Sequence, residues 1–315
     1  MKRILVIQTA FLGDAVLVTS ILEKLHAFHP DAAIDLAVRK GNEGLFDGHP
    51  FLRRLHIWDK RKGKTRDLFR LIGDLRRTRY DHVINAQRFF STGLMTVLAK
   101  GREKVGYDKN PLSFLFSRTV KHVIGDGWHE VDRLNALIEH LTDGSRPLPK
   151  LHPITAPEAD DHVCIAPASV WFTKQWPEEK WIELIGQLAQ GVKVLLIGAP
   201  GDVSLCERIA RKAGRGEVLA GRLSLLATAA LMKGARMNYV NDSAPLHIAS
   251  AMNAPVTAVF CSTVPAFGFG PLNANGRVVE IGEKLYCRPC GLHGYTACPE
   301  GHFKCALAID ARAMG

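Results

Sequence analysis

One acidic residue stands just beyond the first apolar run of the sequence. Asp14 follows the run RILVI and the single Gly13, at the start of a segment with helical spacing. A carboxylate at such a position can cap or charge the first turn of its helix, or it can face a ligand as a general base. Asp14 is therefore the candidate base in this half of the chain.

The loop at 167–177 places a cation between a strand-like run and a helical segment. Lys174 is well aimed there at a phosphate, whereas Trp176 and Pro177 fix the loop by packing. Farther along, Asp202 ends the segment LLIGAPGD and either holds a ribose hydroxyl or caps its own helix.

The segment YVNDSAPLH predicts a helix N-terminus. Asp242 and Ser243 precede Pro245, and proline is favoured in the first helical turn. The free amides of such a helix start can bind an anion, and a diphosphate would fit. His247 lies on the first turn of this helix, where a histidine is more often structural than ligand-binding.

Short apolar runs alternate with amphipathic segments of helix length throughout, which is typical of a parallel sheet covered by helices. The expected strands are 4–7, 34–38, 55–58, 82–85, 120–124, 163–166, 192–197, 237–240, 256–260 and 278–281. The expected helices are 14–29, 65–78, 128–141, 178–190, 202–213, 223–233 and 245–252. This pattern predicts an α/β protein with two doubly wound units in tandem.

The two units are expected to meet in residues 142–157, which are rich in glycine and proline and lack helical or strand periodicity. This places the domains at 1–150 and 151–315. Ligands of such sheets bind at the carboxyl ends of the strands, so a cleft between the units is the expected site. Only Gly13 is present where a dinucleotide-binding turn needs three glycines, which disfavours a dehydrogenase or flavoprotein.

The composition is that of a soluble globular protein. The chain has 315 residues, of which 47% are hydrophobic and 23% charged, and this excludes a disordered, collagen-like or coiled-coil chain. The net charge of +10 lies almost entirely in residues 1–152, and residues 53–79 alone carry +8. We expect either a negatively charged partner or a solvated basic face. A nucleic-acid partner is disfavoured because only Trp58 and Phe69 interleave this run.

The sequence holds no apolar stretch long enough to cross a membrane. Its start is basic and then apolar like a signal peptide, but Gln8, Thr9 and Asp14 interrupt the apolar region. We therefore expect a cytoplasmic protein, in which Cys164 and the other scattered cysteines are buried as small hydrophobic residues.

Four cysteines crowd the end of the chain. Cys287, Cys290, Cys298 and Cys305 open with a C-x2-C pair, which is how a Zn²⁺ or iron–sulfur site can begin. The spacing of the second pair is not that of a standard zinc ribbon. A structural metal, disulfides and unlinked thiols all remain open.

Three segments of the chain carry a family resemblance. ILVIQTAFLGDAVLVTSIL, TKQWPEEKWIELI and VNDSAPLHIASAMNAPVTAVF resemble the signature segments of the lipopolysaccharide heptosyltransferases, glycosyltransferase family 9. The resemblance implies a GT-B fold, with two Rossmann-like domains that bind the acceptor in the N-terminal half and the nucleotide sugar in the C-terminal half. It also implies transfer of heptose from ADP-heptose to the lipopolysaccharide inner core, with inversion and with no metal or other cofactor required for catalysis. The alternative is a GT-B transferase that uses another nucleoside-diphosphate sugar in cell-surface glycan assembly.

The resemblance assigns roles to individual residues. Asp14 becomes the base that takes the acceptor proton, and Lys174 becomes a partner of the diphosphate. The other positions implied for the nucleotide sugar are Ser169, Asp202, Asp242, Ser243, Ala244 and His247. Glycine is usual in the family where Ala244 and Pro245 stand, which puts the closest approach of backbone to phosphate in doubt.

An acceptor of lipid A carrying Kdo, or of heptosylated core, bears carboxylates and phosphates in the cytoplasmic leaflet of the inner membrane. The resemblance thus implies peripheral contact with that membrane, and it gives the basic run a partner. The acceptor-side candidates are Arg61, Lys62, Lys64, Gln87 and Arg88.

Overall fold

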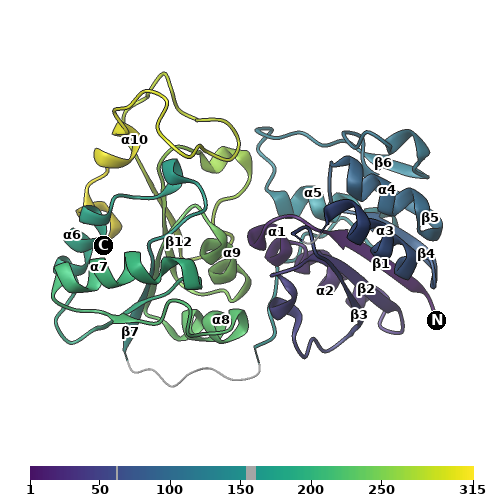
Figure 1. The fold of residues 1–315 in the computed structure, drawn as a ribbon, viewed down its shortest axis with the longest axis horizontal. Coiled ribbons are helices and arrows are strands. Elements are labelled where there is room, and N and C mark those ends of the chain that lie inside the picture. Colours follow the sequence, from purple (N-terminus) through teal and green to yellow (C-terminus); the bar gives the residue numbers. More distant parts are fainter. Residues whose placement is uncertain (62, 154–160) are drawn as a thin grey trace. The chain divides into compact units, whose positions relative to one another are not determined.

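The computed structural model describes residues 1–61, 63–153 and 161–315. Contacts within the chain divide it into two compact units (Figure 1). The first contains Met1–Ile124 and Trp128–His152, and the second contains Gly125–Gly127 and Pro153–Gly315. None of the helices in these ranges has both the length and the apolar character that crossing a bilayer requires.

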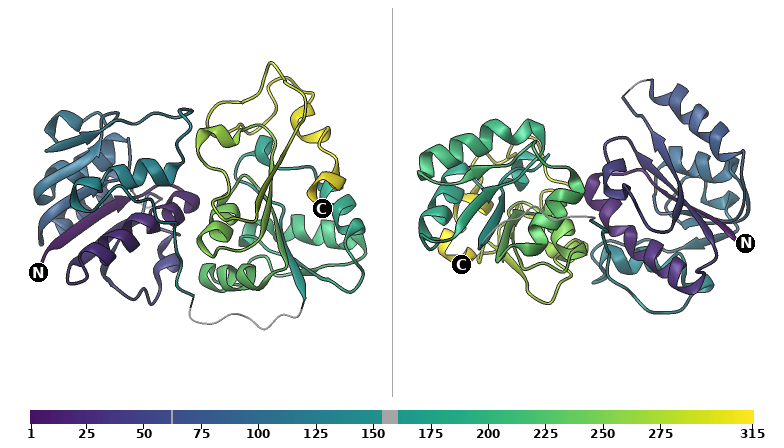
Figure 2. Two further views of the ribbon diagram at one scale, coloured as in Figure 1. Left: turned by 180° about the vertical axis from the view of Figure 1, so that it is seen from behind. Right: turned by 90° about the horizontal axis from the view of Figure 1, so that it is seen from below.

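The first unit is a parallel six-stranded sheet in the order β3-β2-β1-β4-β5-β6. Its strands are β1 (Arg3–Gln8), β2 (Ala33–Arg39), β3 (Leu52–Trp58), β4 (Arg79–Asn85), β5 (Lys100–Tyr107) and β6 (Arg118–Val120). Its helices are α1 (Leu12–Leu17), α2 (Thr19–Phe28), α3 (Lys64–Leu75), α4 (Phe90–Leu98) and α5 (Glu130–Ala136). Helices α3 and α4 pack together over one core, and α2 packs with α5 (Figure 2).

The second unit repeats this arrangement with the order β12-β11-β10-β7-β8-β9. Its strands are β7 (His162–Ala166), β8 (Lys193–Leu196), β9 (Glu217–Val218), β10 (Met237–Asn241), β11 (Val256–Phe260) and β12 (Gly276–Glu280). Its helices are α6 (Glu178–Gln187), α7 (Val203–Ala213), α8 (Leu225–Gly234), α9 (Ala244–Ala251) and α10 (Lys304–Leu307). Helix α6 packs with α7, and α8 packs with α9.

In both sheets the order in which the chain adds strands reverses at one place. This place is between β1 and β4 in the first unit and between β7 and β10 in the second. Ligands of doubly wound sheets bind outside the strand ends at this switch point. Asp14, Arg88, Lys174 and Asp242 lie in the segments that follow these four strands. The predicted fold class of two doubly wound α/β units is confirmed.

Four of these helices and strands were not predicted from the sequence: β5, β9, α4 and α10. Strand β5 opens with the charged run KGREK and only then becomes buried, so it lacks the apolar pattern of a strand. Helix α4 has the apolar sequence FSTGLMTVL, and β9 has only two residues. The predicted helix 14–29 is two helices, because the backbone turns at Val18 between α1 and α2.

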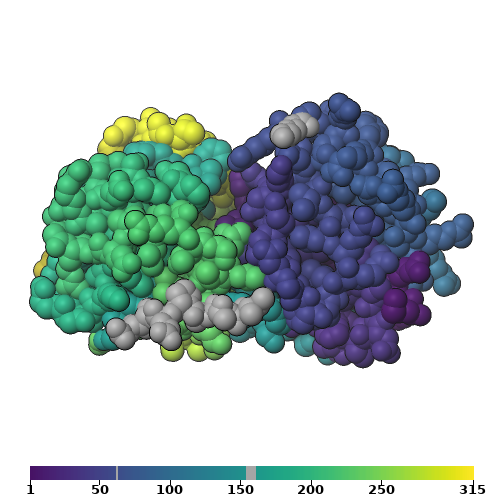
Figure 3. Space-filling view, turned by 60° about the horizontal axis from the view of Figure 1, so that its bottom comes forward, coloured from purple at the N-terminus to yellow at the C-terminus, as the bar shows by residue number. Residues whose placement is uncertain are grey.

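The basic run is divided among several elements and partly neutralised. Arg53 forms a two-point ion pair with buried Asp35, at 2.8 and 2.5 Å. On α3, Arg70 bonds to Asp67 and Asp74. Figure 3 shows the part of the chain to which α3 belongs, coloured blue, at the surface of the molecule. Some of the charge of the run is therefore paired within the fold, and the expectation of a negatively charged partner or a solvated basic face stays a prediction.

Candidate functional site

Lys174 and Asp242 form a mostly buried ion pair at the switch point of the second sheet. Lys174 ends the short 3-10 helix η4 (Phe172–Lys174) after β7, and Asp242 directly follows β10. The Lys174 Nζ lies 2.6 Å from the Asp242 Oδ2, and the two side chains are 15% and 6% exposed. Thr263, which follows β11, donates its hydroxyl to the same oxygen at 2.5 Å. Residues after three strands thus converge on one carboxylate.

Asn241 ties the Lys174 loop to β10. Its Nδ2 donates to the carbonyl of Pro167 at 2.8 Å, and its Oδ1 accepts from the amide of Trp176 at 2.9 Å. The Trp176 ring is buried and meets Trp181 edge to face, with ring centres 5.0 Å apart. Both ends of the loop are therefore fixed, as the packing role predicted for Trp176 requires.

Helix α9 begins next to this ion pair. Ser243 precedes its first residue, Ala244, and Pro245 lies in the first turn, so the predicted helix N-terminus is confirmed. His247 is buried and packs edge to face against Phe269. The amides and dipole of this helix start favour an anion beside Lys174.

Two other predicted donor-side residues are held by local bonds. The Asp202 Oδ2 accepts a 2.8 Å hydrogen bond from the amide of Ala199, which is the capping alternative. The Ser169 carbonyl accepts from Gln175 Nε2 at 2.6 Å. Among the described contacts, neither residue bonds to Lys174 or Asp242, so their part in donor binding stays a prediction.

The cysteine-rich loop grips the residue beside Lys174. The amide of Tyr295 donates to Thr173 Oγ1 at 2.8 Å, and the Thr173 amide donates to the Tyr295 carbonyl at 3.1 Å. Gly294 has a φ of +78°, and a Cβ there would lie 2.8 Å from Thr173 Oγ1 and 3.1 Å from the Cγ of Lys174. Glycine is required at this close approach. The sequence analysis missed both Thr173 and Thr263, whose only signal was a hydroxyl near a strand end.

The four clustered cysteines line a cavity of about 330 Å³ together with His302. All seven cysteines are free thiols, so the structure contains none of the disulfides that the sequence left open. Cys287 Sγ lies 3.9 Å from His302 Nε2, and burial raises the pKa of Cys305 to about 11. In the described part of the chain, the groups with three ligand atoms within 4.8 Å of one another contain histidines and glutamates instead of these thiols.

In the first unit, Asp14 lies in the first turn of α1, half-buried. Its neighbourhood is marked by Tyr107, which ends β5. Burial raises the pKa of Tyr107 well above its usual value; Glu130 and Asp14 add to the effect, and Arg133 and Arg88 oppose it. Asp14 and Arg88 therefore share one electrostatic environment at the switch point of the first sheet.

A buried ion pair supports this environment. Arg133 Nε lies 2.9 Å from Glu130 Oε2, and both side chains are less than 9% exposed. Burial raises the pKa of Glu130, and Arg133 opposes the shift. Burial also lowers the pKa of His122 to about 4, with help from Arg88 and Arg133. This pair could not be predicted from the sequence, because opposite charges at an i, i+3 spacing also occur on exposed helix faces.

The acceptor-side candidates differ in burial and in hydrogen bonding. Gln87 is buried, and its Nε2 donates to Gln8 Oε1 at 2.5 Å, so its side chain ties β4 to β1. Arg88 is half-buried, and Arg61 and Lys64 are exposed. Lys62 lies outside the described residues.

Lys60 was not among the predicted acceptor-side residues, yet the structure places it beside the segment that follows β1. Its Nζ donates to the carbonyl of Thr9 at 2.6 Å and lies 4.4 Å from the centre of the Trp58 ring. Burial lowers the pKa of Lys60 to about 8, and the charges of Arg39 and Lys64 add to the shift. The ammonium group is therefore held next to the loop that leads to Asp14.

The chain resembles known proteins over most of its length. It is 27% identical over 313 residues to lipopolysaccharide heptosyltransferase 1 of Pseudomonas aeruginosa, which covers 91% of this chain and 86% of that protein. Its structure matches the E. coli heptosyltransferase WaaC with ADP at a TM-score of 0.76 and 25% identity, covering 99% and 97% of the two chains. It also matches the same E. coli enzyme with ADP-2-deoxy-2-fluoro heptose at a TM-score of 0.73 and 26% identity, covering 88% and 92%.

These matches confirm the predicted GT-B fold class and the predicted family. The family model for glycosyltransferase family 9 (heptosyltransferase) matches residues 68–294, which span the second half of the first sheet and nearly all of the second unit. This chain therefore belongs to glycosyltransferase family 9, the heptosyltransferase family.

Proposed function

We propose that this glycosyltransferase moves a heptose from ADP-heptose to a hydroxyl of the lipopolysaccharide inner core. The observation that carries the proposal is the Lys174–Asp242 ion pair beside the N-terminus of α9. The heptosyltransferase names of its relatives, and the ADP and ADP-heptose analogue bound by the E. coli enzyme, support the same donor.

The second unit, residues 151–315, binds the donor in this proposal. Asp242 occupies one hydrogen of the Lys174 ammonium, which leaves two for the diphosphate. The amides of Ser243 and Ala244 add donors at the helix start. Ser169 and His247 complete the phosphate side, and Asp202 holds the ribose through the carboxylate oxygen that does not accept from Ala199.

Charge development explains how these groups accelerate the reaction. As the bond between the anomeric carbon and the phosphate oxygen breaks, its electron pair moves to ADP. Lys174 and the helix amides stabilise that charge more strongly in the transition state than in the ground state. This arrangement makes a divalent cation unnecessary for catalysis.

Asp14 acts on the acceptor in the first unit, residues 1–150. Its carboxylate takes the proton of the attacking hydroxyl while the oxygen bonds to the anomeric carbon, opposite the departing ADP. The configuration at that carbon therefore inverts. A positioned general base contributes about 10²–10⁴-fold to such a rate.

Basic side chains of the first unit hold the acceptor. Lys60 contacts the loop that leads to Asp14, and Arg88 and Asp14 both act on Tyr107. Arg61, Lys62 and Lys64 follow Lys60 in sequence. The carboxylates and phosphates of lipid A carrying Kdo, or of heptosylated core, would pair with them. The same charges favour the anionic cytoplasmic face of the inner membrane, where we place this protein as a peripheral enzyme.

The cysteine cluster has a supporting role in this proposal. Because Tyr295 grips Thr173, a Zn²⁺ ion or an iron–sulfur cluster at Cys287, Cys290, Cys298 and Cys305 would stiffen the loop that carries Lys174. Metal analysis of cytosolically expressed protein tests this prediction. Less than a tenth of an equivalent of zinc or iron per chain would contradict it.

Substitution of Asp14 by Asn tests the catalytic assignment. Asp14→Asn removes the base without changing the side-chain volume, so we expect turnover to fall at least a hundredfold while ADP binds as before. Asp31→Asn, at an exposed position of the same unit, is the matched control and should keep full activity. Normal turnover in Asp14→Asn would refute the base.

A panel of nucleotide sugars, with and without core acceptors, tests the donor. We expect release of ADP from ADP-heptose that depends on the acceptor. Faster turnover of another nucleoside-diphosphate sugar would replace the heptosyl assignment by the alternative, and would leave Asp14 and Lys174 in the same roles.

A further inference from the structure

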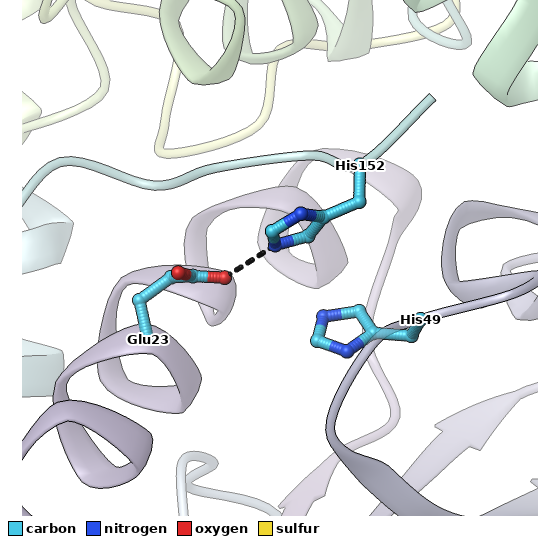
Figure 4. Close-up of side chains that lie close together, drawn as sticks. All are labelled: Glu23, His49 and His152. Atoms are coloured by element: carbon cyan, nitrogen blue, oxygen red, sulfur yellow. Dashed lines mark hydrogen bonds and ion pairs between the residues drawn. The ribbon is translucent and has the colours of Figure 1, made fainter. Parts of the chain in front are cut away.

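Three side chains of the first unit form a polar cluster that the proposed reaction does not use. Glu23 lies on α2, His49 lies in the loop after the 3-10 helix η1 (Glu43–Phe46), and His152 is the last residue of the unit. His152 Nε2 is 2.6 Å from Glu23 Oε1. One ligand atom of each residue lies within 4.8 Å of the other two. Figure 4 shows the two imidazole rings beside each other, with the carboxylate facing His152.

His49 is the member that the fold leaves unsatisfied. Both of its ring nitrogens are buried and have no hydrogen-bond partner. A buried polar group in that state is destabilising. Phe51 and His152 pack against the ring edge to face, with ring centres 4.5 and 5.0 Å away, so the ring has a fixed place.

Burial of the His49 ring disfavours its protonated form. Burial lowers the pKa of His49 to about 4, and the charges of His152 and His26 add to the effect. A neutral imidazole has a free nitrogen lone pair, which is the form that binds a metal ion. A cation between His49 and Glu23 would supply the partner that the structure does not show.

A second cluster of the same composition makes the contrast clear. His82, Glu103 and His140 are equally close to one another. There, however, both rings bond to Glu103, at 2.8 and 3.3 Å, and Arg118 lies 3.8 Å from the other carboxylate oxygen. The carboxylate already has three basic partners, and a guanidinium group opposes a further cation. The carboxylate of this cluster is therefore engaged without a metal, although the Nδ1 of His140 has no hydrogen-bond partner.

We propose that Glu23, His49 and His152 bind a Zn²⁺ ion. Two imidazole nitrogens and one carboxylate oxygen are ligands that zinc accepts, and a water completes the tetrahedron. On binding, His152 Nε2 and Glu23 Oε1 turn from each other to the ion, and His49 contributes one of its two buried nitrogens.

The ion would fasten the end of the first unit to α2. The segment 143–152 already lies along this helix. Lys24 Nζ, which is buried, donates to the carbonyls of Asp143 and Ser145 at 2.8 and 2.6 Å, and the Lys150 amide donates to Thr19 Oγ1 at 2.9 Å. Zinc at His152 would add a third attachment and join the loop at His49 to it.

Metal titration of the full chain, free of any affinity tag, tests the proposal. Zn²⁺ binding is titrated by calorimetry and Co²⁺ binding by absorbance. The absorbance of bound Co²⁺ distinguishes thiolate ligands from nitrogen and oxygen ligands. A Cys287→Ser, Cys290→Ser background removes the competing thiolates. In this background the expected result is one Co²⁺ per chain with nitrogen and oxygen ligands and without a sulfur-to-cobalt charge-transfer band.

Two substitutions identify the ligands. Glu23→Gln keeps the side-chain size and its bond to His152, and His49→Phe keeps the ring packing; each should weaken Zn²⁺ binding at least tenfold. Glu103→Gln, in the second cluster, is the matched control and should bind Zn²⁺ as the wild type does. Zinc at a hundredfold excess over Kd should raise the Tm of the wild type by about 5 °C, and that of the two variants by much less.

The outcome decides the proposal in either direction. Unchanged Zn²⁺ affinity in both Glu23→Gln and His49→Phe would overturn it, as would a cobalt spectrum that arises from thiolates alone. A metal-free His49→Phe variant whose Tm equals that of the wild type would show that lost zinc binding does not come from unfolding.

Discussion

Substitution of Lys174 by Met separates the ion pair that this side chain forms with Asp242 from its proposed role in donor binding. The change removes the ammonium and keeps most of the apolar stem. Among the described side-chain contacts, Asp242, which is 6% exposed, then keeps the hydrogen bond from Thr263 alone. Breaking a buried ion pair costs about 3–5 kcal/mol. Because Lys174 itself is 15% exposed, we expect a loss at the lower end of this range, about 3 kcal/mol in the free energy of unfolding.

The double variant Lys174→Met, Asp242→Asn distinguishes stability from binding. Asparagine carries no charge to leave unpaired, so urea unfolding should recover at least half of the lost free energy. ADP binding should not recover, because a hydrogen bond to a charged group is worth about 1.5–3 kcal/mol, or roughly 10- to 150-fold in Kd. Calorimetric titration with ADP measures this loss of affinity in both variants.

Lys180→Met is the control for loss of a lysine from the same unit. Lys180 forms an i, i+3 pair with half-exposed Glu183 on α6, so the free energy of unfolding should change by less than about 1 kcal/mol. Wild-type ADP affinity in Lys174→Met would refute the proposed donor site. A double variant no more stable than the single one would refute the account of the buried carboxylate.

Two further predictions concern stability. Although burial alone would raise the pKa of Asp35, hydrogen bonds from His56, Arg53 and Tyr80 lower it from 3.8 to about 2. This carboxylate should contribute about 2 kcal/mol to the free energy of unfolding above pH 4, and the contribution should be lost as the pH falls from 3.8 toward 2. Asp35→Asn should abolish that part of the pH dependence in urea unfolding. An unchanged pH profile in this variant would count against the prediction. In Gly93→Ala the new Cβ would meet Asn110 Oδ1 at 2.2 Å, whereas Gly73 on α3 has no atom within 4 Å of that position. We expect the first change to destabilise by about 1–3 kcal/mol and Gly73→Ala to stabilise by up to about 1 kcal/mol, and equal Tm values for the two variants would contradict this reasoning.

The sequence predicted the elements whose patterns are local. The buried strands β1, β2, β7, β10 and β11 have apolar runs that need no tertiary context, and Pro245 marks the start of α9 in the way proline does elsewhere. Strand β5 could not be found in this way, because its first residues are charged and its burial begins only at Val105.

The candidate site was predicted residue by residue but not as a geometry. Lys174 and Asp242 were each singled out, yet their ion pair depends on the order of β7 and β10 in the sheet. Lys60 and the Glu130–Arg133 pair were missed for the same reason, since their significance lies in what the fold buries around them. Composition shows the charge of a segment, and only the structure shows which charges are already paired.

The clasp between Tyr295 and Thr173 joins residues 122 positions apart. During synthesis on the ribosome, the Lys174 loop emerges long before the segment that grips it. A nascent chain can therefore form the strands of both sheets while the proposed donor site is still unfinished. The loop that holds Lys174 is thus completed only after every strand around it has been translated.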